Sequence, residues 1–434
     1  MEREPLGVVG AGWVGLITAA GFAELGHEVV VRDVLPDRIA ALEAGEVPIH
    51  EPGLDEALAR NRARLRFTLD MADLPASGIV FVCVGTPSTA SGDADLSAVW
   101  RVLDELPRGG DGLLLVMKST VPVGTGARVR RRLDARGLAH VGYVSNPEFL
   151  AEGTGLENVA RPDRVVVGAE VAAQGDRVAA LFEPLGIPVV RTDVASAEMI
   201  KLASNAALMT RVSFINEIAN VCELVGADVE QVALGVGLDH RIGPHFLRAG
   251  IGYGGSCFPK DASALKQLAA NSGYHFQLLS AVIDVNELQK RRVVQKLQAH
   301  LGSLGGKVVT LLGLAFKANT NDLREAPSLV LAPRLAAEGA VVRAWDPVAL
   351  GEAQAILDDV ELHETVLEAV TGADAAVIVT EWEELRGLAS PEVLAAMRTP
   401  LIVDGRNLLD PAAVRAVGFV YESVGRPSAP AQEG

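Results

Sequence analysis

The sequence predicts an α/β protein in which two Rossmann-like, doubly wound sheet domains are joined by a central domain of long helices. Three observations predict this architecture. A glycine-rich turn follows an apolar strand near the start, a long helical pattern fills the middle, and strand–helix alternation resumes after residue 305. At 434 residues with 49% hydrophobic composition, the chain can bury more than one core. We expect domains at 1–194, 195–304 and 305–434.

The first strand–helix–strand unit carries a dinucleotide fingerprint. An apolar strand from Leu6 runs into the turn Gly10-Ala11-Gly12-Trp13-Val14-Gly15. A helix pattern follows to Leu25, and a second strand, His27–Arg32, ends on Asp33, eighteen residues after Gly15. The glycines permit a tight turn and a close approach of a pyrophosphate to the helix N-terminus. Asp33 would bind ribose hydroxyls and repel a 2′-phosphate, so the pattern predicts NAD rather than NADP.

Three further strands of the first domain end at polar or turn residues. They are expected at 79–84, 113–118 and 141–145. Ligands of doubly wound sheets bind outside the carboxyl ends of the strands, so Thr86, Thr120 and Glu148 should face the cofactor crevice. Cys83 falls within the first of these strands, which favours a core position over a chemical role.

The middle part opens with a long helix, expected at 195–225, whose apolar residues cover most of its circumference. Lys201 and Asn205 lie on one face of it, four residues apart. Lys201 either pairs structurally with a carboxylate such as Glu198 or serves chemistry, because both polar residues are costly to bury without a purpose. A second helical stretch, 260–300, would approach 60 Å if unbroken, at ~1.5 Å per residue. Its broad side face makes a dimer or higher homo-oligomer plausible.

Alternation of strands and helices restarts in the third part. The strands are expected at 308–313, 340–345, 375–380 and 401–403, with a helix at 328–338. The turn Gly313-Leu314-Ala315-Phe316 lacks the full dinucleotide fingerprint. A second nucleotide group, belonging to the substrate, is therefore a candidate ligand of this sheet.

A single cysteine stands in a glycine-rich run that leads into a helix. The run is Gly250-Ile251-Gly252-Tyr253-Gly254-Gly255-Ser256-Cys257-Phe258-Pro259-Lys260-Asp261. Pro259 suits a first helical position, so Cys257 should lie just outside a helix N-terminus, where the dipole lowers a thiol pKa. A free cysteine is more often an inert buried residue, but the glycines, Lys260 and Asp261 favour a reactive thiolate here.

Charge and composition exclude several classes of function. The formal net charge of −16 argues against a surface for nucleic acid or an anionic membrane. The three cysteines form no Cys-x-x-Cys pair, which predicts a reducing compartment, and the eight histidines show no metal-ligand spacing. No signal segment or membrane-length apolar run is apparent. We therefore expect a cytoplasmic protein without a metal site.

Together these motifs resemble the UDP-glucose/GDP-mannose dehydrogenase family over nearly the whole chain. Within that family, Cys-Phe-Pro-Lys-Asp favours the UDP-glucose branch, because the GDP-mannose branch usually has Leu at the Phe258 position. Two departures are visible: Trp13 stands where the family often has Tyr, and Ala151 where many bacterial members have Arg. Besides the first turn and the cysteine run, the resemblance is carried by Val84-Gly85-Thr86-Pro87, Ser119-Thr120-Val121-Pro122-Val123-Gly124-Thr125, Asn146-Pro147-Glu148-Phe149-Leu150-Ala151-Glu152-Gly153, Lys201-Leu202-Ala203-Ser204-Asn205, Arg241-Ile242-Gly243, Leu314-Ala315-Phe316-Lys317 and Asp404-Gly405-Arg406.

The resemblance implies an NAD-dependent, four-electron oxidation of the C6 hydroxyl of a sugar nucleotide to a carboxylate, as from UDP-glucose to UDP-glucuronate. Cys257 would capture the aldehyde as a thiohemiacetal that is oxidised to a thioester and hydrolysed. Lys201 and Asn205 would stabilise the oxyanion, and Asp261, with Thr120 and ordered water, would take the hydroxyl proton. Glu148 and Glu152 are both candidates for activating the hydrolytic water and for holding the sugar.

The resemblance also implies which residues contact the ligands, with Arg241 reaching into the site of a neighbouring subunit. Cofactor contacts would come from Gly10, Gly12, Trp13, Val14, Gly15, Asp33, Arg38, Thr86, Pro87, Thr120, Glu152, Lys260 and Arg324. Substrate contacts would come from Glu148, Phe149, Leu150, Lys201, Asn205, Arg241, Phe246, Leu247, Arg248, Tyr253, Gly254, Phe316, Lys317 and Arg406.

Other readings remain open at the level of the sequence. The same chemistry could act on GDP-mannose, dTDP-glucose or a UDP-N-acetylhexosamine. The β-hydroxyacid and 6-phosphogluconate dehydrogenases share a Rossmann domain and Lys-x-x-x-Asn on a long helix, but they transfer one hydride and need no cysteine. A non-enzymatic nucleotide sensor on this fold is a third reading, because fold alone does not fix function.

Overall fold

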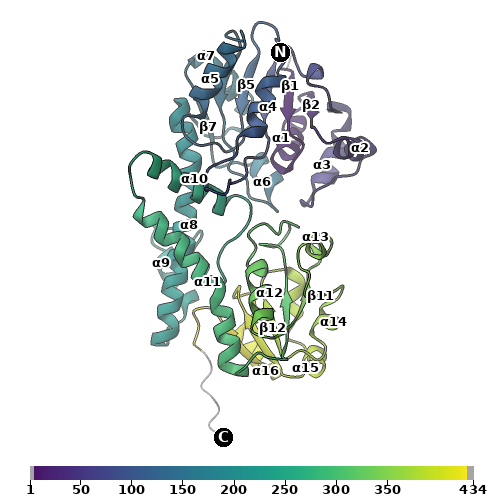
Figure 1. Cartoon of the computed structure of the whole chain (residues 1–434), viewed down its shortest axis with the longest axis vertical. Helices are drawn as coiled ribbons and strands as arrows, with labels where there is room; N and C mark the ends of the chain where they lie inside the picture. Colours follow the sequence, from purple (N-terminus) through teal and green to yellow (C-terminus); the bar gives the residue numbers. More distant parts are fainter. Residues whose placement is uncertain (1–3, 428–434) are drawn as a thin grey trace. The chain divides into compact units, whose positions relative to one another are not determined.

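A computed structural model describes residues 4–427 of the chain. The chain divides into two compact units, one formed by residues 1–204 with 260–275 and the other by residues 205–259 with those from 276 onward. Helices α8 (Val194–Val225) and α10 (Phe258–Asn271) each contribute to both units (Figure 1). The finer boundaries expected at 194 and 304 stay predictions.

The N-terminal unit is built on a sheet with eight strands in the described part of the chain, ordered β3-β2-β1-β4-β5-β6-β7-β8. Every neighbouring pair is parallel except β6 and β7, which are antiparallel. Apolar runs such as Leu6–Val9 and Ile79–Val82 form the central strands because both faces of a parallel sheet are covered. The strands are β1 Leu6–Val9, β2 Val29–Arg32, β3 Leu65–Thr68, β4 Ile79–Val82, β5 Leu114–Met117, β6 Gly142–Ser145, β7 Val165–Ala169 and β8 Val189–Thr192.

Helices pack on both faces of this sheet and bury two separate cores. One core contains Leu16, Phe22 and Phe81, and the other contains Leu103 and Leu133. This doubly wound arrangement confirms the Rossmann-like fold predicted for the first domain. The helices are α1 Trp13–Glu24, α2 Pro36–Ala44, α3 Leu54–Arg60, α4 Ser97–Glu105, α5 Thr125–Ala135, α6 Gly155–Ala160 and α7 Ala172–Ala180.

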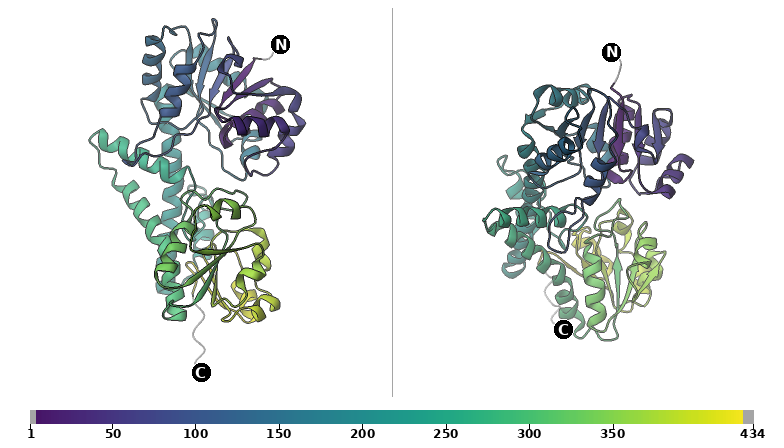
Figure 2. Two further views of the ribbon diagram at one scale, coloured as in Figure 1. Left: turned by 45° about the vertical axis from the view of Figure 1, so that its right-hand side comes forward. Right: turned by 45° about the horizontal axis from the view of Figure 1, so that its top comes forward.

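The middle of the chain is helical, as predicted, and α8 is drawn as one unbroken helix (Figure 2). It is followed by α9 (Val229–Gly237), α10 and α11 (Gln277–Leu301). The helical stretch expected over 260–300 is present but is broken into α10 and α11. Gly273 takes a φ of +78°, and the N–H groups of Gly273 and Tyr274 bond back to Ala270 and Ala269. This glycine cap ends α10, because a left-handed residue at this position satisfies the last carbonyls of a helix.

The C-terminal sheet has six strands within residues 4–427, all parallel, in the order β11-β10-β9-β12-β13-β14. This order repeats the β3-β2-β1-β4-β5-β6 part of the first sheet, so the second Rossmann-like domain is confirmed. Its strands are β9 Val308–Leu312, β10 Val341–Trp345, β11 Val360–His363, β12 Ala375–Ile378, β13 Leu401–Asp404 and β14 Val420–Ser423. Its helices are α12 Pro327–Ala337, α13 Leu350–Gln354, α14 Val366–Val370, α15 Pro391–Ala396 and α16 Pro411–Val417.

Candidate active site

The turn between β1 and α1 forms a cradle for a pyrophosphate. Gly10 has a φ of +105°, and a Cβ on it would lie 2.7 Å from the carbonyl oxygen of Cys83. A Cβ on Gly15 would lie 1.8 Å from the carbonyl oxygen of Gly10, so neither position tolerates a side chain. A Cβ on Gly12 would meet no atom within 4 Å. The turn is therefore tight on its inner side and open at Gly12, in front of the N-terminus of α1, as a dinucleotide requires.

Asp33 lies at the end of β2, beside this turn, and is buried. Its Oδ2 accepts a hydrogen bond from the Ala11 amide at 2.6 Å, and its Oδ1 accepts one from the Leu35 amide at 3.0 Å. Arg38 Nη1 is 3.5 Å from Oδ2. A carboxylate at the end of the second strand is placed to accept hydrogen bonds from the ribose hydroxyls of NAD. The residues of this site therefore fit NAD.

The ends of β4 and β5 are joined by a hydrogen bond between two predicted cofactor residues. The hydroxyl of Thr86 donates to the carbonyl oxygen of Thr120 at 2.8 Å, and Thr86 is buried while Pro87 is exposed. Strand β4 ends at Val82, so Cys83 follows the strand rather than lying inside it. Burial raises the pKa of the Cys83 thiol to about 12, which keeps it protonated and inert.

Lys201 and Glu148 form a buried ion pair. Lys201 Nζ is 2.8 Å from Glu148 Oε1, and both side chains are at most 5% exposed. Burial raises the pKa of Glu148, but the charge and hydrogen bond of Lys201, the Leu150 amide and the charge of Lys118 together outweigh it, so the pKa lies below its usual value of 4.5. Lys201 Nζ also lies 5.6 Å from the centre of the Phe149 ring. The structure therefore brings three predicted site residues together.

The alternative partner considered for Lys201, Glu198, is engaged elsewhere. Glu198 accepts hydrogen bonds from the amides of Gly124 and Gly126, each at 2.7 Å, at the start of α5. It lies one turn before Lys201 on α8 and faces the loop that carries Thr120. Asn205 lies one turn beyond Lys201 and is buried.

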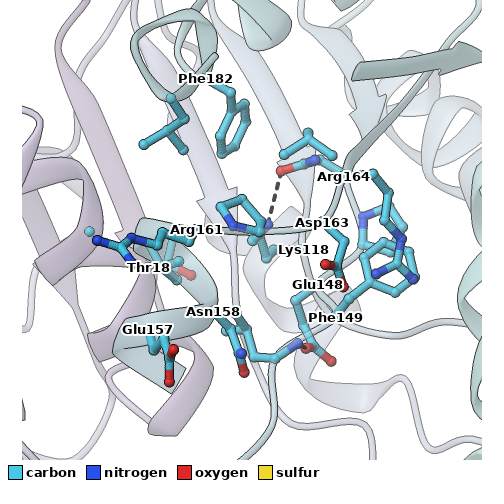
Figure 3. Close-up of a pocket in the computed structure, with 18 of the residues that line it drawn as sticks. Thr18, Lys118, Glu148, Phe149, Glu157, Asn158, Arg161, Asp163, Arg164 and Phe182 are labelled. Carbon is cyan, nitrogen blue, oxygen red and sulfur yellow. Dashed lines mark hydrogen bonds between the residues drawn. The ribbon is translucent and has the colours of Figure 1, made fainter. Parts of the chain in front are cut away.

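A cavity of about 280 Å³ opens beside Glu148 within the N-terminal unit (Figure 3). Glu148, Phe149 and Leu150 line one side of it. Lys118 reaches it from the end of β5 and donates to Asn146 Oδ1 at 3.1 Å, the bond dashed in Figure 3. Burial lowers the pKa of Lys118 from its usual 10.5. Sequence reasoning did not single out Lys118.

The first turn of α10 holds a second lysine–carboxylate pair. Lys260 Nζ is 2.5 Å from Asp261 Oδ1, and Asp261 is only 1% exposed. Both residues were predicted for the site, Lys260 on the cofactor side and Asp261 as the proton acceptor. The pair places a carboxyl group and an amino group at the start of α10.

Cys257 directly precedes α10 and is partly exposed, as predicted from its sequence context. Its Sγ lies 3.6 Å from the hydroxyl of Ser256. The preceding glycines are needed for packing as well as for access. A Cβ on Gly254 would lie 2.2 Å from the carbonyl oxygen of Glu325, and one on Gly255, with φ +85°, would strike the Phe316 ring at 2.7 Å. The loop is therefore pressed against the turn that follows β9.

Three buried amide side chains hold the cysteine loop, and sequence reasoning missed all of them. Asn216 on α8 accepts from the Gly250 amide at 2.8 Å, and Gln289 on α11 donates to the Gly250 carbonyl at 2.9 Å. Asn286 on α11 bonds both backbone groups of Tyr253, at 2.9 and 3.0 Å. The only available signal was an amide residue on the apolar face of a helix.

The predicted substrate residues of the C-terminal unit fall into several environments. The Tyr253 ring meets the Phe258 ring edge-on at 5.6 Å, and Phe246 lies 6.4 Å from Phe258. Arg248 lines a cavity of about 70 Å³ together with Arg406. Leu247, in contrast, is buried in the core of the central helices.

The side chain of Arg406 connects three loops by hydrogen bonds. Its guanidinium donates to the carbonyl oxygens of Val379, Gly252 and Phe316, at 2.7, 3.0 and 2.9 Å. One of these carbonyls belongs to the cysteine loop. Lys317 Nζ lies 5.7 Å from the centre of the neighbouring Phe316 ring. A contact of Arg406 or Lys317 with substrate stays a prediction.

Comparison with known proteins identifies the chain. Family models for the NAD binding domain, the central domain and the UDP binding domain of the UDP-glucose/GDP-mannose dehydrogenase family match residues 5–186, 195–288 and 310–411. The chain belongs to this family. It is therefore an NAD-dependent oxidoreductase, and the expectation of NAD is confirmed.

Individual relatives share the whole length of the chain. The UDP-glucose 6-dehydrogenase TuaD of Bacillus subtilis is 45% identical over 430 residues, covering 98% of this chain and 93% of that protein. A UDP-glucose dehydrogenase structure from Pyrobaculum islandicum is 37% identical, with a TM-score of 0.90 and 98% of each chain covered. A UDP-D-ManNAc dehydrogenase structure from Pyrococcus horikoshii is 27% identical, with a TM-score of 0.86, covering 97% of this chain and 99% of that one.

Two arginines that the family resemblance assigned to ligands lie at the surface of the chain. Arg241, with 78% of its side chain exposed, pairs with Asp239 at 2.6 Å. Arg324, with 66% exposed, pairs with Asp322 at 2.8 Å. Arg211 holds the loop of Arg241 through bonds to three backbone carbonyls.

The described residues contain no group of three or more His, Cys, Asp or Glu side chains placed to hold a metal ion. In the same part of the chain, no helix combines the length and apolar character needed to cross a bilayer.

Proposed function

We propose that this family member oxidises the C6 hydroxyl of UDP-glucose to the carboxylate of UDP-glucuronate, with two molecules of NAD reduced per sugar. The observation that carries the proposal is Cys257 at the N-terminus of α10, in a loop that packs against Phe316 and Glu325 of the UDP binding domain. The names of relatives at 45% identity support UDP-glucose as the substrate.

The covalent role of Cys257 follows from its chemistry. When bound, NAD would supply the hydride acceptor for the two oxidations at C6. The thiolate adds to the aldehyde carbon to give a thiohemiacetal, and the second oxidation leaves a thioester. Water then breaks the C–S bond, which releases the carboxylate and returns the thiolate. A thiolate outside a helix N-terminus suits this role, because the dipole stabilises its charge.

The two lysine–carboxylate pairs, Lys201 with Glu148 and Lys260 with Asp261, would serve charge stabilisation and proton transfer. Lys201, with Asn205 one turn away, supplies donors for the negative charge that develops on the C6 oxygen. Asp261, paired with Lys260, accepts the hydroxyl proton together with Thr120 and water. Glu148 is bound to Lys201 and has a lowered pKa, which suits holding the sugar more than accepting a proton. Glu152 is then the better candidate to activate the hydrolytic water.

We propose that NAD and the sugar nucleotide are bound by the cofactor-contact and substrate-contact residues that the family resemblance implies. Asp33 and Arg38 would hold the adenosine ribose of NAD, and the turn of Gly10 to Gly15 would hold its pyrophosphate.

We further propose a homodimer or higher oligomer, because α8 and α9 carry several exposed apolar side chains. They are Val221, Leu224 and Val225 on α8, Leu234 on α9, and Leu238 directly after α9. Cys83 and Cys222, which are buried as free thiols, support a cytoplasmic location.

Replacing the nucleophile tests the mechanism. Cys257→Ser should still bind NAD and UDP-glucose, but turnover should collapse because serine lacks an accessible anion at neutral pH. Mass spectrometry of the stalled variant should detect an ester of enzyme and sugar nucleotide. Iodoacetamide should inactivate the parent enzyme at Cys257, and bound substrate should protect it. Near-normal two-step oxidation by Cys257→Ala would overturn the covalent mechanism.

A count of NADH formed per sugar nucleotide consumed separates the classes of function. Two molecules indicate oxidation to the acid, one indicates a single-hydride dehydrogenase, and none a sensor. A parallel panel of UDP-glucose, GDP-mannose, dTDP-glucose and UDP-N-acetylhexosamines, ranked by kcat/KM, tests the substrate. A higher kcat/KM on any sugar nucleotide other than UDP-glucose would refute that part of the proposal.

A further inference from the structure

The side chain of Glu51 is buried between the dinucleotide turn and the loop that carries Glu152. It is only 5% exposed. Its Oε2 accepts hydrogen bonds from Trp13 Nε1 and from the Gly153 amide, both at 2.7 Å, and its Oε1 accepts from the Gly155 amide at 2.6 Å. One carboxylate therefore binds the indole at the start of α1 and two backbone amides that follow Glu152.

The helices attached to these two loops are packed too closely to move independently. A Cβ on Gly21 of α1 would lie 2.1 Å from the side chain of Val159 on α6. At the other end of the contact, a Cβ on Gly155 would lie 2.7 Å from the Trp13 ring. Packing at this density transmits displacements rather than absorbing them. A shift of Trp13 therefore reaches Gly155 both through the ring contact and through Glu51.

The three hydrogen bonds that Glu51 accepts are short, at 2.6 to 2.7 Å. An ionised carboxylate that accepts from N–H groups forms shorter and stronger bonds than a neutral acceptor. Leaving one such donor unpaired in a buried place costs its desolvation. Trp13 contributes a single donor, and it stands in the turn that receives the pyrophosphate. Glu51 thus responds to the position of the indole and holds the backbone next to Glu152.

We propose that Glu51 is a positioning residue that couples NAD binding at the first turn to the placement of Glu152. Through Trp13, an occupied dinucleotide site tightens the segment from Gly153 to Gly155, and this fixes the carboxylate that acts on the hydrolytic water. The role of Glu152 rests on the function proposed above, whereas the coupling between the two loops does not.

Amide hydrogen exchange tests the coupling without any substrate. NAD should slow exchange in peptides that cover residues 150–160 of the parent protein. Glu51→Gln should raise basal exchange at Gly153 and Gly155, because the amide side chain retains one acceptor in place of two. It should also abolish the slowing by NAD in this segment. If NAD leaves exchange over 150–160 unchanged in the parent, the coupling is refuted.

Kinetics test what the coupling does for the reaction. In Glu51→Gln, release of the acid should slow by about tenfold, as expected for one buried, charge-assisted hydrogen bond, while the first NADH forms at a near-parental rate. The covalent enzyme–sugar intermediate should then accumulate and be visible by mass spectrometry. A purely structural role would lower all rates together and leave no such intermediate. That outcome would also overturn the proposal.

Trp13→Phe provides the second variant, since it keeps ring packing on Gly155 and removes only the indole N–H. Its effects on NAD affinity and on acid release should not add to those of Glu51→Gln in the double variant, because both disrupt the same hydrogen-bonded link from Trp13 through Glu51 to Gly153 and Gly155. Trp345→Phe, which removes an indole N–H donated to the Glu364 carbonyl in the C-terminal sheet, is the matched control. It should leave NAD affinity unchanged. Additive losses would refute the proposal, and a parent enzyme that forms no NADH from UDP-glucose would refute the proposed function alone.

Discussion

Glu148 shows how two buried lysines set the state of one carboxylate. Lys201 pairs with it directly at 2.8 Å, and Lys118, which lines the same cavity, adds a weaker attraction. These charges hold the pKa of Glu148 below its usual value although burial opposes them. The group is therefore a fixed negative charge over the whole neutral range, and the stability it provides is lost as pH falls through its folded pKa.

The Glu148–Lys201 pair predicts a separation of stability from activity. Lys201→Met leaves a buried carboxylate unpaired and should lower the free energy of unfolding by about 3–5 kcal/mol, measured by urea unfolding. It should also reduce kcat by about 10²–10³, the loss expected for one oxyanion donor. Adding Glu148→Gln should recover most of the stability, because no unpaired charge remains, but none of the activity. A double variant as unstable as Lys201→Met would show that the ion pair is not the source of the loss.

The single side chain of Asp33 determines the preference for NAD over NADP. Asp33→Ala removes a charged acceptor for the ribose hydroxyls and should weaken NAD binding by about 1.5–3 kcal/mol. Discrimination against NADP should fall, because the repulsion of a 2′-phosphate is lost. Calorimetric titration of both cofactors measures the two effects. Asp33 also accepts a hydrogen bond from the Ala11 amide, so its loss could loosen the turn. Comparing the melting temperatures of Asp33→Ala and the parent protein controls for this effect. Equal use of NADP by the parent protein would contradict this assignment.

At the scale of elements, α8 is tied to α5 by Glu198. Its two oxygens accept the Gly124 and Gly126 amides at the start of α5, one turn before Lys201. The loop that carries Thr120 and the helix that carries Lys201 are thereby fixed to one another. A lone Glu in a helix is usually exposed, which is why the sequence offered no sign of this contact.

The same side chain predicts a pH dependence of stability. Burial raises the pKa of Glu198 from 4.5 to about 7. Between these values the unfolded chain releases the proton and the folded chain keeps it, so the free energy of unfolding should fall as pH rises through this window, by up to about 3 kcal/mol. Urea unfolding from pH 4 to 8 should show this fall in the parent. Glu198→Gln, which does not titrate, should flatten it, and an unchanged slope in Glu198→Gln would assign the titration to another group.

Elements with a strong local pattern could be predicted, and the others could not. Buried apolar runs located β1, β4, β5, β9 and β12 to within a few residues. The strands β3, β7, β8, β11 and β14 were missed. In β3, β8, β11 and β14 at least one of the four residues is exposed, so their short patterns carry little signal. Strand β7 is buried, but no motif marks its end. Motif residues such as Cys257 and Lys201 could be proposed for the site because their chemistry is unusual in its context. Side chains that position backbone, such as Glu51 and Asn286, depend on contacts distant in sequence and left no local sign.

At the scale of the whole molecule, the exposed apolar side chains of α8 and α9 predict an interface with a second copy. Leu224 and Leu238 are 86% and 77% exposed. Leucines this exposed, with other apolar residues beside them, mark a surface that is covered in the assembly. Sedimentation should detect at least a dimer, and replacing both leucines with lysine should shift it toward the monomer.

Arg241 allows a direct test of whether two subunits share each site. Arg241→Ala should lose activity while remaining folded, whereas Arg191→Ala, at another exposed ion pair, should not. Mixed after dissociation and reassembly, inactive Arg241→Ala and inactive Cys257→Ser should regain about a quarter of parental activity if the protein is a twofold dimer. Half of the dimers would then be hybrids, and each hybrid would hold one site with both an intact cysteine and an intact arginine from its neighbour. If every subunit supplies its own Arg241, no site in the mixture is complete, and the mixture stays inactive.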